Sequence, residues 1–146
     1  MKQCVKIKIV RENAICPSYQ SASAAGADLY AALDKAVTVE AGQTVFVPTG
    51  IAMEIPEGFV GLVFARSGLA CKKGLAPANK VGVIDSDYRG EIMVALHNHS
   101  KAPVQVLNGE RIAQIVLTPY LTAEFEECKE LSETVRGEGG FGSTGK

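Results

Sequence analysis

The residues best suited to chemistry lie in the segment NKVGVIDSDYRG, which runs from Asn79 to Gly90. An apolar run ends there in two carboxylates, Asp85 and Asp87, which are followed by Tyr88. A carboxylate can take a proton from water, and the side-chain amide of Asn79 offers the donor and the acceptor that reading a base edge requires. The same segment also fits a plain hairpin in which the aspartates serve the turn.

A second group of residues is suited to binding an anion. Arg66-Ser67-Gly68 follows an expected strand and opens the one short stretch with a helical pattern, residues 67–72. The guanidinium of an arginine can donate two parallel hydrogen bonds to phosphate oxygens, and the N-terminus of a helix adds backbone N–H donors. Asp28 stands at the head of an expected strand, and Gln114 lies on an otherwise apolar one.

The C-terminus concentrates glycine, with five of the 15 glycines in the last ten residues. Such a composition is typical of a linker or a frayed end. The stretch 137–142 matches G-x-G-x-x-G, and 140–146 resembles a phosphate-binding loop. Both matches fail on context, because the chain given has no helix-length segment after either of them.

Other potential metal ligands form no convincing group. His97 and His99 share one face of an expected strand but have no third ligand nearby in sequence, so we interpret them as an ordinary strand end. The four cysteines are far apart and form no C-x-x-C pair. This spacing excludes the usual zinc patterns and predicts buried or idle thiols in a reducing compartment.

Composition excludes several classes of protein. With 146 residues, 47% of them hydrophobic, the chain fits one folded domain. A net charge of -1 argues against a non-specific nucleic-acid binder. No apolar run approaches the ~20 residues of a membrane span, and the first residues have no signal-peptide pattern. We therefore expect no nucleic-acid or membrane partner and a cytoplasmic location, or a nuclear one if the source is eukaryotic.

The elements that must position these residues are nearly all strands. The alternation of Val5, Ile7 and Ile9 with lysines predicts a half-exposed strand. Further strands are expected at 44–47, 50–55, 59–65, 91–96, 104–107 and 111–117. Asn108-Gly109 predicts a tight hairpin, and 124–133 is either an exposed helical turn or an irregular arm. The pattern indicates an antiparallel barrel or jelly-roll sandwich over residues 1–120, followed by an arm, 121–146.

Five segments in this order, 25–32, 66–70, 79–98, 111–116 and 136–145, resemble the five motifs of the homotrimeric deoxyuridine triphosphatases (dUTPases). The resemblance covers nearly the whole chain. It implies an all-β, distorted jelly-roll barrel with one short helix and a flexible Gly-rich C-terminal arm. It also implies a homotrimer with shared active sites that hydrolyses dUTP to dUMP and pyrophosphate with Mg²⁺.

The resemblance also implies roles for single residues. Asp85 would be the general base that activates water for attack on the α-phosphorus. Mg²⁺ would be held mainly by the substrate phosphates, with Asp28 near it through water. The residues expected to bind substrate are Arg66, Ser67, Gly68 and Gln114 at the phosphates, Asn79, Val83 and Ile84 at uracil, Tyr88 and Met93 at the deoxyribose, and Arg136, Phe141, Gly142, Ser143 and Thr144 in the closing arm.

Two alternatives compete with this interpretation. A deoxycytidine triphosphate deaminase of the same fold would place a catalytic glutamate where this chain has Ala95. A non-catalytic jelly-roll interaction trimer would leave Asp85, Arg66-Ser67-Gly68 and the patterned tail unexplained.

Overall fold

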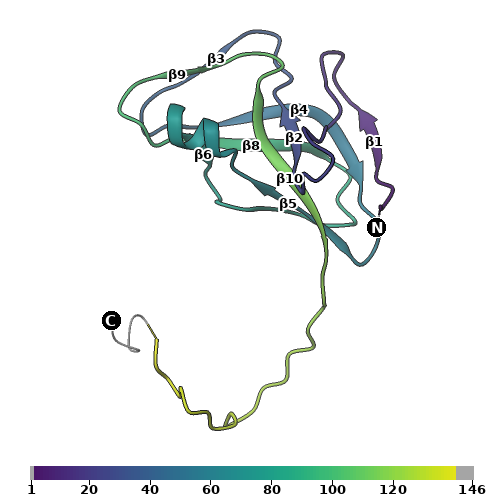
Figure 1. The fold of residues 1–146 in the computed structure, drawn as a ribbon, viewed down its shortest axis with the longest axis vertical. Coiled ribbons are helices and arrows are strands. Elements are labelled where there is room, and N and C mark those ends of the chain that lie inside the picture. Colours follow the sequence, from purple (N-terminus) through teal and green to yellow (C-terminus); the bar gives the residue numbers. More distant parts are fainter. Residues whose placement is uncertain (1, 141–146) are drawn as a thin grey trace.

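The computed structural model describes residues 2–140 of the chain, and these fold into a β-barrel with a trailing arm (Figure 1). The elements are β1 (Lys6–Ile9), β2 (Ala27–Tyr30), β3 (Val37–Val39), β4 (Thr44–Glu54), β5 (Phe59–Phe64), η1 (Leu69–Lys73), β6 (Leu75–Pro77), β7 (Gly82–Ile84), β8 (Glu91–Asn98), β9 (Val104–Val106) and β10 (Arg111–Pro119). The expected all-β class with one short helix is confirmed.

Two four-stranded antiparallel sheets form the barrel, with strand orders β1-β4-β8-β6 and β2-β10-β5-β7. A two-stranded ribbon, β3-β9, completes it. Alternation is clearest on β8, where Ile92, Val94 and Leu96 are buried in the core while Met93 is 41% exposed. This period of two is the jelly-roll arrangement of an apolar interior and a polar exterior.

Strand β4 differs from the prediction of two strands separated by a turn at Pro48–Gly50. The chain runs on as one strand, because these residues form a bulge at which the pairing with β8 shifts register between Pro48 and Ala52. Gly50 has the positive φ of 71° that the bulge requires. The hydroxyl of buried Thr49 donates to the carbonyl of Ile92 at 2.7 Å, which fixes the bulge against β8.

The Asn108-Gly109 hairpin prediction is also wrong. Strands β9 and β10 flank these residues, but β9 pairs with β3, and β10 pairs with β2 and β5. Gly109 has a positive φ and Asn108 does not, so this is not the turn that the dipeptide favours. Instead the side-chain oxygen of Asn108 accepts the backbone N–H of Leu33 at 3.0 Å and ties two loops together.

Of three smaller predictions, one is wrong, one is confirmed and one keeps a single alternative. Strand β1 was expected to be half-exposed, yet all its residues are exposed in the single chain, because it is an edge strand that pairs only with β4. The expected helix at 67–72 is confirmed, since residues 67–73 are helical with η1 at Leu69–Lys73, and it ends where Gly74 takes a φ of 73°. The cysteines were expected to be buried or idle; all four are free and exposed, so only the buried alternative is excluded.

After β10 the described part of the arm, residues 120–140, runs away from the barrel without helix or strand (Figure 1). The irregular alternative for 124–133 is therefore confirmed over the helical one. Its apolar side chains are almost fully exposed: Leu121 98%, Phe125 94% and Leu131 87%. No helix among residues 2–140 is both long enough and apolar enough to cross a membrane.

Candidate active site

A buried ion-pair cluster forms the first half of the site. Asp28 on β2 is 4% exposed, and both of its carboxylate oxygens accept from arginines. The Nε of Arg66 donates at 2.7 Å, and an Nη of Arg111 donates at 3.4 Å. A buried carboxylate needs such partners. Arg66 is therefore held through its inner nitrogen, and its terminal nitrogens, which donate to nothing among residues 2–140, remain available.

Gln114 is fixed beside this cluster by strand pairing. It stands opposite Asp28 on β2 and Phe64 on β5, and its amide nitrogen donates to the carbonyl of Ala65 at 2.9 Å. A side chain at Gly26 would start 2.4 Å from the amide oxygen of Gln114. Glycine at position 26 therefore makes room for the observed place of Gln114.

These residues line one cavity of about 240 Å³, which we call the arginine cavity. Its lining is Gln20, Ala24, Gly26, Asp28, Arg66, Ser67, Gly68 and Gln114. Arg66 is the one cation among these lining residues and stands beside the carboxylate of Asp28. The terminal nitrogens of its guanidinium suit a phosphate group. The volume is below the roughly 300–1,000 Å³ of pockets that enclose a drug-sized ligand. The arginine cavity alone fits an anionic group and not a whole nucleotide.

The second half of the site lies on β7 and the turn that follows it. Among residues 2–140, β7 pairs with β5 alone, so it is an edge strand whose outer N–H and C=O groups are available to a ligand. Val83 on this strand is 60% exposed, and Asn79 just before it is exposed as well. Lys80 has a φ of 66°, which is uncommon for a residue with a side chain and marks a strained connection beside Asn79.

The turn after β7 carries Asp85. The backbone N–H of Tyr88 donates to the carbonyl of Asp85 at 3.2 Å, and the guanidinium of Arg89 donates to the carbonyls of Ser86 at 2.6 Å and Tyr88 at 3.1 Å. The carboxylate of Asp85 is exposed and accepts no hydrogen bond from residues 2–140. The backbone of the turn is therefore fastened, while the candidate base is left free for water.

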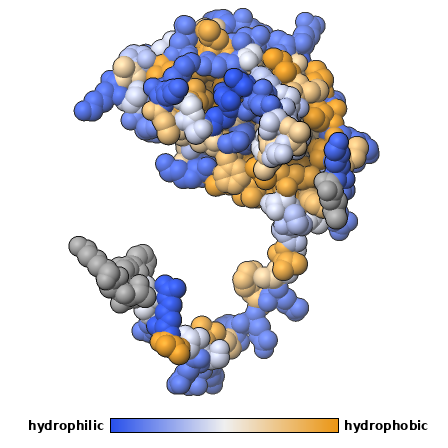
Figure 2. Space-filling view, viewed as in Figure 1, coloured by the Kyte–Doolittle hydropathy of each residue, from blue (hydrophilic) through white to orange (hydrophobic). Residues whose placement is uncertain are grey.

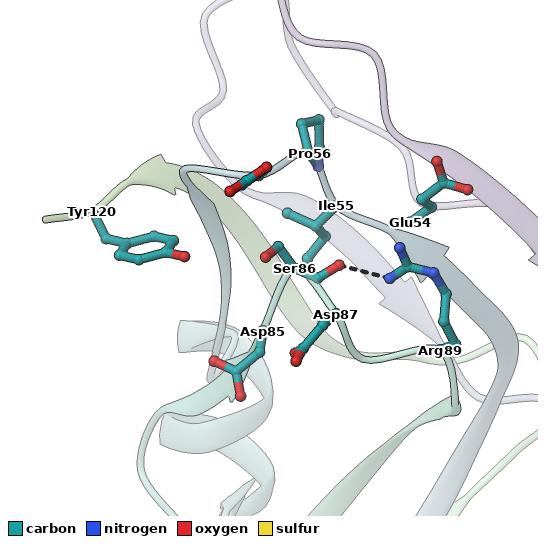
Figure 3. Close-up of a pocket in the computed structure, with 9 residues that line it drawn as sticks. Glu54, Ile55, Pro56, Asp85, Ser86, Asp87, Arg89 and Tyr120 are labelled. Carbon is teal, nitrogen blue, oxygen red and sulfur yellow. Dashed lines mark hydrogen bonds between the residues drawn. The ribbon is translucent and has the colours of Figure 1, made fainter. Parts of the chain in front are cut away.

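A cavity of about 650 Å³ opens on one side of this turn (Figure 3). We call it the acidic cavity, because its lining residues are Glu54, Ile55, Pro56, Glu57, Asp85, Ser86, Asp87, Arg89 and Tyr120. In Figure 3 the carboxylates of Asp85 and Asp87 point to the same side, away from Glu54 and Arg89. Four carboxylates against one arginine make this wall negative, whereas the arginine cavity has one carboxylate and one arginine.

The structure brings together some predicted site residues and separates others. Asp28, Arg66–Gly68 and Gln114 share the arginine cavity, which has no lining residue in common with the acidic cavity around Asp85. Tyr88 and Met93 are 45% and 41% exposed, beyond β7. Within one chain, the two halves of the predicted site do not form one pocket.

The arm adds one described residue to the predicted site. The Nε of Arg136 donates to the carbonyl of Gly139 at 2.7 Å, within an exposed turn of the arm. The predicted residues Phe141, Gly142, Ser143 and Thr144 lie outside the described residues.

No group of three or more His, Cys, Asp or Glu side chains among residues 2–140 is arranged to hold a metal ion. The two histidines have other partners: the ring of His97 shares a hydrogen bond with the hydroxyl of Thr44 at 3.0 Å, and that of His99 with the carbonyl of Ala70 at 3.1 Å. Both lie at the end of β8, as the sequence suggested.

Sequence reasoning missed the part of Arg111 in fixing Asp28. A lone cation on an apolar strand was visible, but its partner depends on the pairing of β10 with β2.

Comparison with known proteins gives a consistent result. The dUTPase family model matches residues 12–145. The deoxyuridine 5'-triphosphate nucleotidohydrolase of Desulfitobacterium hafniense (strain Y51) is 56% identical over 144 residues, which are 97% of this chain and 95% of that protein. The enzyme of the same name from Acinetobacter baumannii (strain AYE) is 52% identical over 131 residues, 89% of this chain and 87% of that protein.

Solved structures agree with the sequence relatives. The Staphylococcus bacteriophage 80alpha dUTPase with dUPNHPP matches with a TM-score of 0.86 and 29% identity, over 99% of this chain and 100% of that one. A mutant dUTPase from phage phi11 of S. aureus, described for the coordination of a structural Mg(II) ion, matches with a TM-score of 0.80 and 25% identity, over 90% of this chain and 100% of that one. With the family match spanning nearly all of its length, the chain belongs to the dUTPase family.

Proposed function

We propose that this protein hydrolyses dUTP to dUMP and pyrophosphate, in a homotrimer whose active sites combine two halves from different subunits. The observation that carries the proposal is the separation of the two halves within one chain. The arginine cavity offers the guanidinium of Arg66 to phosphates, and the β7 edge with its turn has groups for a nucleoside. A second copy of the chain can bring the two together.

Exposed apolar surface supports assembly. Figure 2 shows apolar side chains on the barrel beside the point where the arm leaves it. The arm itself exposes Leu121, Phe125, Leu131 and Val135 almost completely. Extended apolar surface of this kind marks a site that another molecule covers. In the proposed trimer the arm lies against a neighbouring subunit and carries Arg136 and Phe141 to that subunit's site.

Uracil fits the edge of β7. The base presents an N–H donor between two carbonyl acceptors, and an edge strand presents donors and acceptors in line. Asn79 adds an amide with both functions, and Gly82 lies close to it: a side chain there would start 3.4 Å from the Asn79 amide nitrogen. The backbone at Val83 and Ile84 then reads the base, while Tyr88 and Met93 contact the deoxyribose.

The triphosphate fits the arginine cavity. Asp28 holds Arg66 in one orientation, so its terminal nitrogens are preorganised for the phosphate oxygens and lose little freedom on binding. Ser67, Gly68 and Gln114 line the same wall. The closing arm adds Arg136 with Gly142, Ser143 and Thr144, and Phe141 covers the base.

Asp85 acts as the general base. Its free carboxylate accepts a proton from a water molecule, whose oxygen forms a bond to the α-phosphorus. The bond from the α-phosphorus to the bridging oxygen breaks, and that oxygen leaves with pyrophosphate. The proton then passes from Asp85 to solvent. Closure of the arm excludes other water and strengthens the contacts to the phosphates.

Mg²⁺ carried by the triphosphate would neutralise phosphate charge and polarise the group under attack. Asp28 suits only an indirect contact with that ion, through water, because both of its oxygens already accept from arginines.

The alternatives are weaker. Ala95, at the position where the deaminase would need a glutamate, stands opposite Phe46 in the β4–β8 pairing and has no acidic group. A non-catalytic trimer does not account for the fixed Arg66 or the free Asp85.

Pyrophosphate release tests the function when it is measured with dUTP, dCTP, dTTP and UTP, with and without Mg²⁺. We expect turnover with dUTP and Mg²⁺ only. Asp85→Asn should abolish turnover and retain binding of dUPNHPP, because the amide cannot accept the proton. Asp87→Asn is the matched control, since this neighbouring exposed carboxylate has no role in the proposed step. Near-normal kcat in Asp85→Asn would exclude Asp85 as the base.

A further inference from the structure

The ring of Tyr88 occupies the space in which any residue other than glycine at position 90 would place its side chain. A Cβ built on Gly90 would lie 2.4 Å from the Oη of Tyr88, 2.6 Å from its Cζ and 2.9 Å from its Cε2. Gly90 is not among the described glycines with positive φ. Its lack of a side chain is therefore required by the ring and not by the backbone conformation.

A hydrogen bond fixes the tip of the same ring. The hydroxyl of Tyr88 donates to the main-chain carbonyl of Glu91 at 3.0 Å. Gly90 and this carbonyl together define where the ring lies, although the side chain is 45% exposed. An exposed aromatic ring without such contacts would be free to change rotamer.

Glu91 is itself firmly held. Its carboxylate accepts from Arg11 at 2.7 and 3.1 Å and from the backbone N–H of Gly50 at 2.9 Å. The hydrogen bond from Arg11 keeps the pKa of Glu91 below its ordinary value, against the opposing effect of burial. The anchor of Tyr88 thus connects to the β4 bulge and to the N-terminal segment.

We infer that Gly90 is a specificity-determining residue, because its missing side chain lets the Tyr88 ring lie where it excludes the 2'-hydroxyl of a ribonucleotide. The inference rests on the proposed function, in which Tyr88 contacts the deoxyribose. In Gly90→Ala the ring tip must move by about 1 Å to restore normal van der Waals distances. That shift breaks the hydrogen bond from Tyr88 to the Glu91 carbonyl, and the displaced ring no longer excludes a 2'-hydroxyl.

The test compares kcat/KM for dUTP with kcat/KM for UTP by pyrophosphate release. Gly90→Ala should lower this ratio about tenfold or more, as loss of shape discrimination at a sugar allows. Gly42→Ala is the control: Gly42 has open space around it but a φ of 74°, so alanine there costs stability without touching the ring. Its ratio should stay at the wild-type value. An unchanged ratio in Gly90→Ala overturns the inference, whatever its absolute activity.

A double-mutant cycle separates this effect from general damage. Tyr88→Ala should lower the ratio by itself, and adding Gly90→Ala to it should have no further effect, because there is no ring left to displace. A further fall would show that Gly90 acts by another route and overturn the inference. If Tyr88→Ala leaves the ratio unchanged, the proposed sugar contact fails and the dUTP activity can still stand.

Tyr88→Phe covers the case in which Gly90→Ala does not fold. It keeps the ring but removes its closest atom to Gly90 and the bond to Glu91. A lower ratio of kcat/KM for dUTP to kcat/KM for UTP in Tyr88→Phe supports the inference that the tip of the ring must be held in place. An unchanged ratio overturns the inference.

Discussion

Two inactive variants should restore activity when they assemble together. The arginine cavity and the turn with Asp85 share no lining residue within one chain. In the proposed trimer each site takes Asp85 from one subunit and Arg66 from the next. A chain with Asp85→Asn keeps an intact phosphate half, and a chain with Arg66→Gln keeps an intact nucleoside half.

The expected magnitude follows from the ring arrangement. In a cyclic trimer with two chains of one variant and one of the other, only one junction joins an intact Asp85 to an intact Arg66. The opposite composition also has one such junction. Every mixed trimer should therefore show about one third of the wild-type rate, while each parent shows almost none.

The assay uses two affinity tags, co-expression and purification through both tags, so that only mixed trimers remain. Pyrophosphate release from dUTP is then measured per trimer. The control pairs Asp85→Asn with the double variant Asp85→Asn/Arg66→Gln, which contains no intact Asp85 and should be inactive. Mixed trimers of the two single variants that are as inactive as their parents would refute the shared site and place both halves in one chain.

Three further results are expected. Deletion of residues 136–146 should lower kcat about a hundredfold or more through loss of phosphate contacts, with an unchanged melting temperature, because the described arm contributes nothing to the core. Gly26→Ala should lower the free energy of unfolding in urea by about 1–3 kcal/mol, since its Cβ would lie 2.4 Å from the amide oxygen of Gln114. Arg11 lowers the pKa of Glu91, so the stability from this pair should be complete above the ordinary value of 4.5 and lost as pH falls below it. Melting temperature against pH should show this loss in the wild type and less of it in Glu91→Gln.

The strands were predictable because hydrophobic residues at every second position can be recognised from the local sequence alone. The interior positions of β8, Ile92, Val94 and Leu96, follow it directly. The bulge in β4 was not predictable in this way. Pro48-Thr49-Gly50 has turn composition, and only its partners Ile92 and Glu91, about forty residues later, make it part of a continuous strand.

The candidate site shows the same division. Residue types pointed to Asp28, Arg66 and Asp85, since a lone carboxylate or cation beside an apolar run is unusual. The pairing of Asp28 with Arg66 and Arg111 depends on β2 lying next to β10, and sequence periodicity does not fix strand order. The separation of Arg66 from Asp85 depends on the closed barrel as a whole.

The negative charge of the acidic cavity explains why the proposed site should need assembly. Glu54, Glu57, Asp85 and Asp87 line the acidic cavity together with one cation, Arg89, so a triphosphate brought there by one chain alone meets like charge. Arg66 in the arginine cavity of a second chain supplies a cation for the phosphates. Substrate binding and subunit association then stabilise each other. A ligand that binds only the trimer favours association by as much free energy as association favours binding of the ligand. A triphosphate analogue should accordingly reduce the dissociation of the trimer on dilution, whereas deoxyuridine, which lacks phosphates, should not.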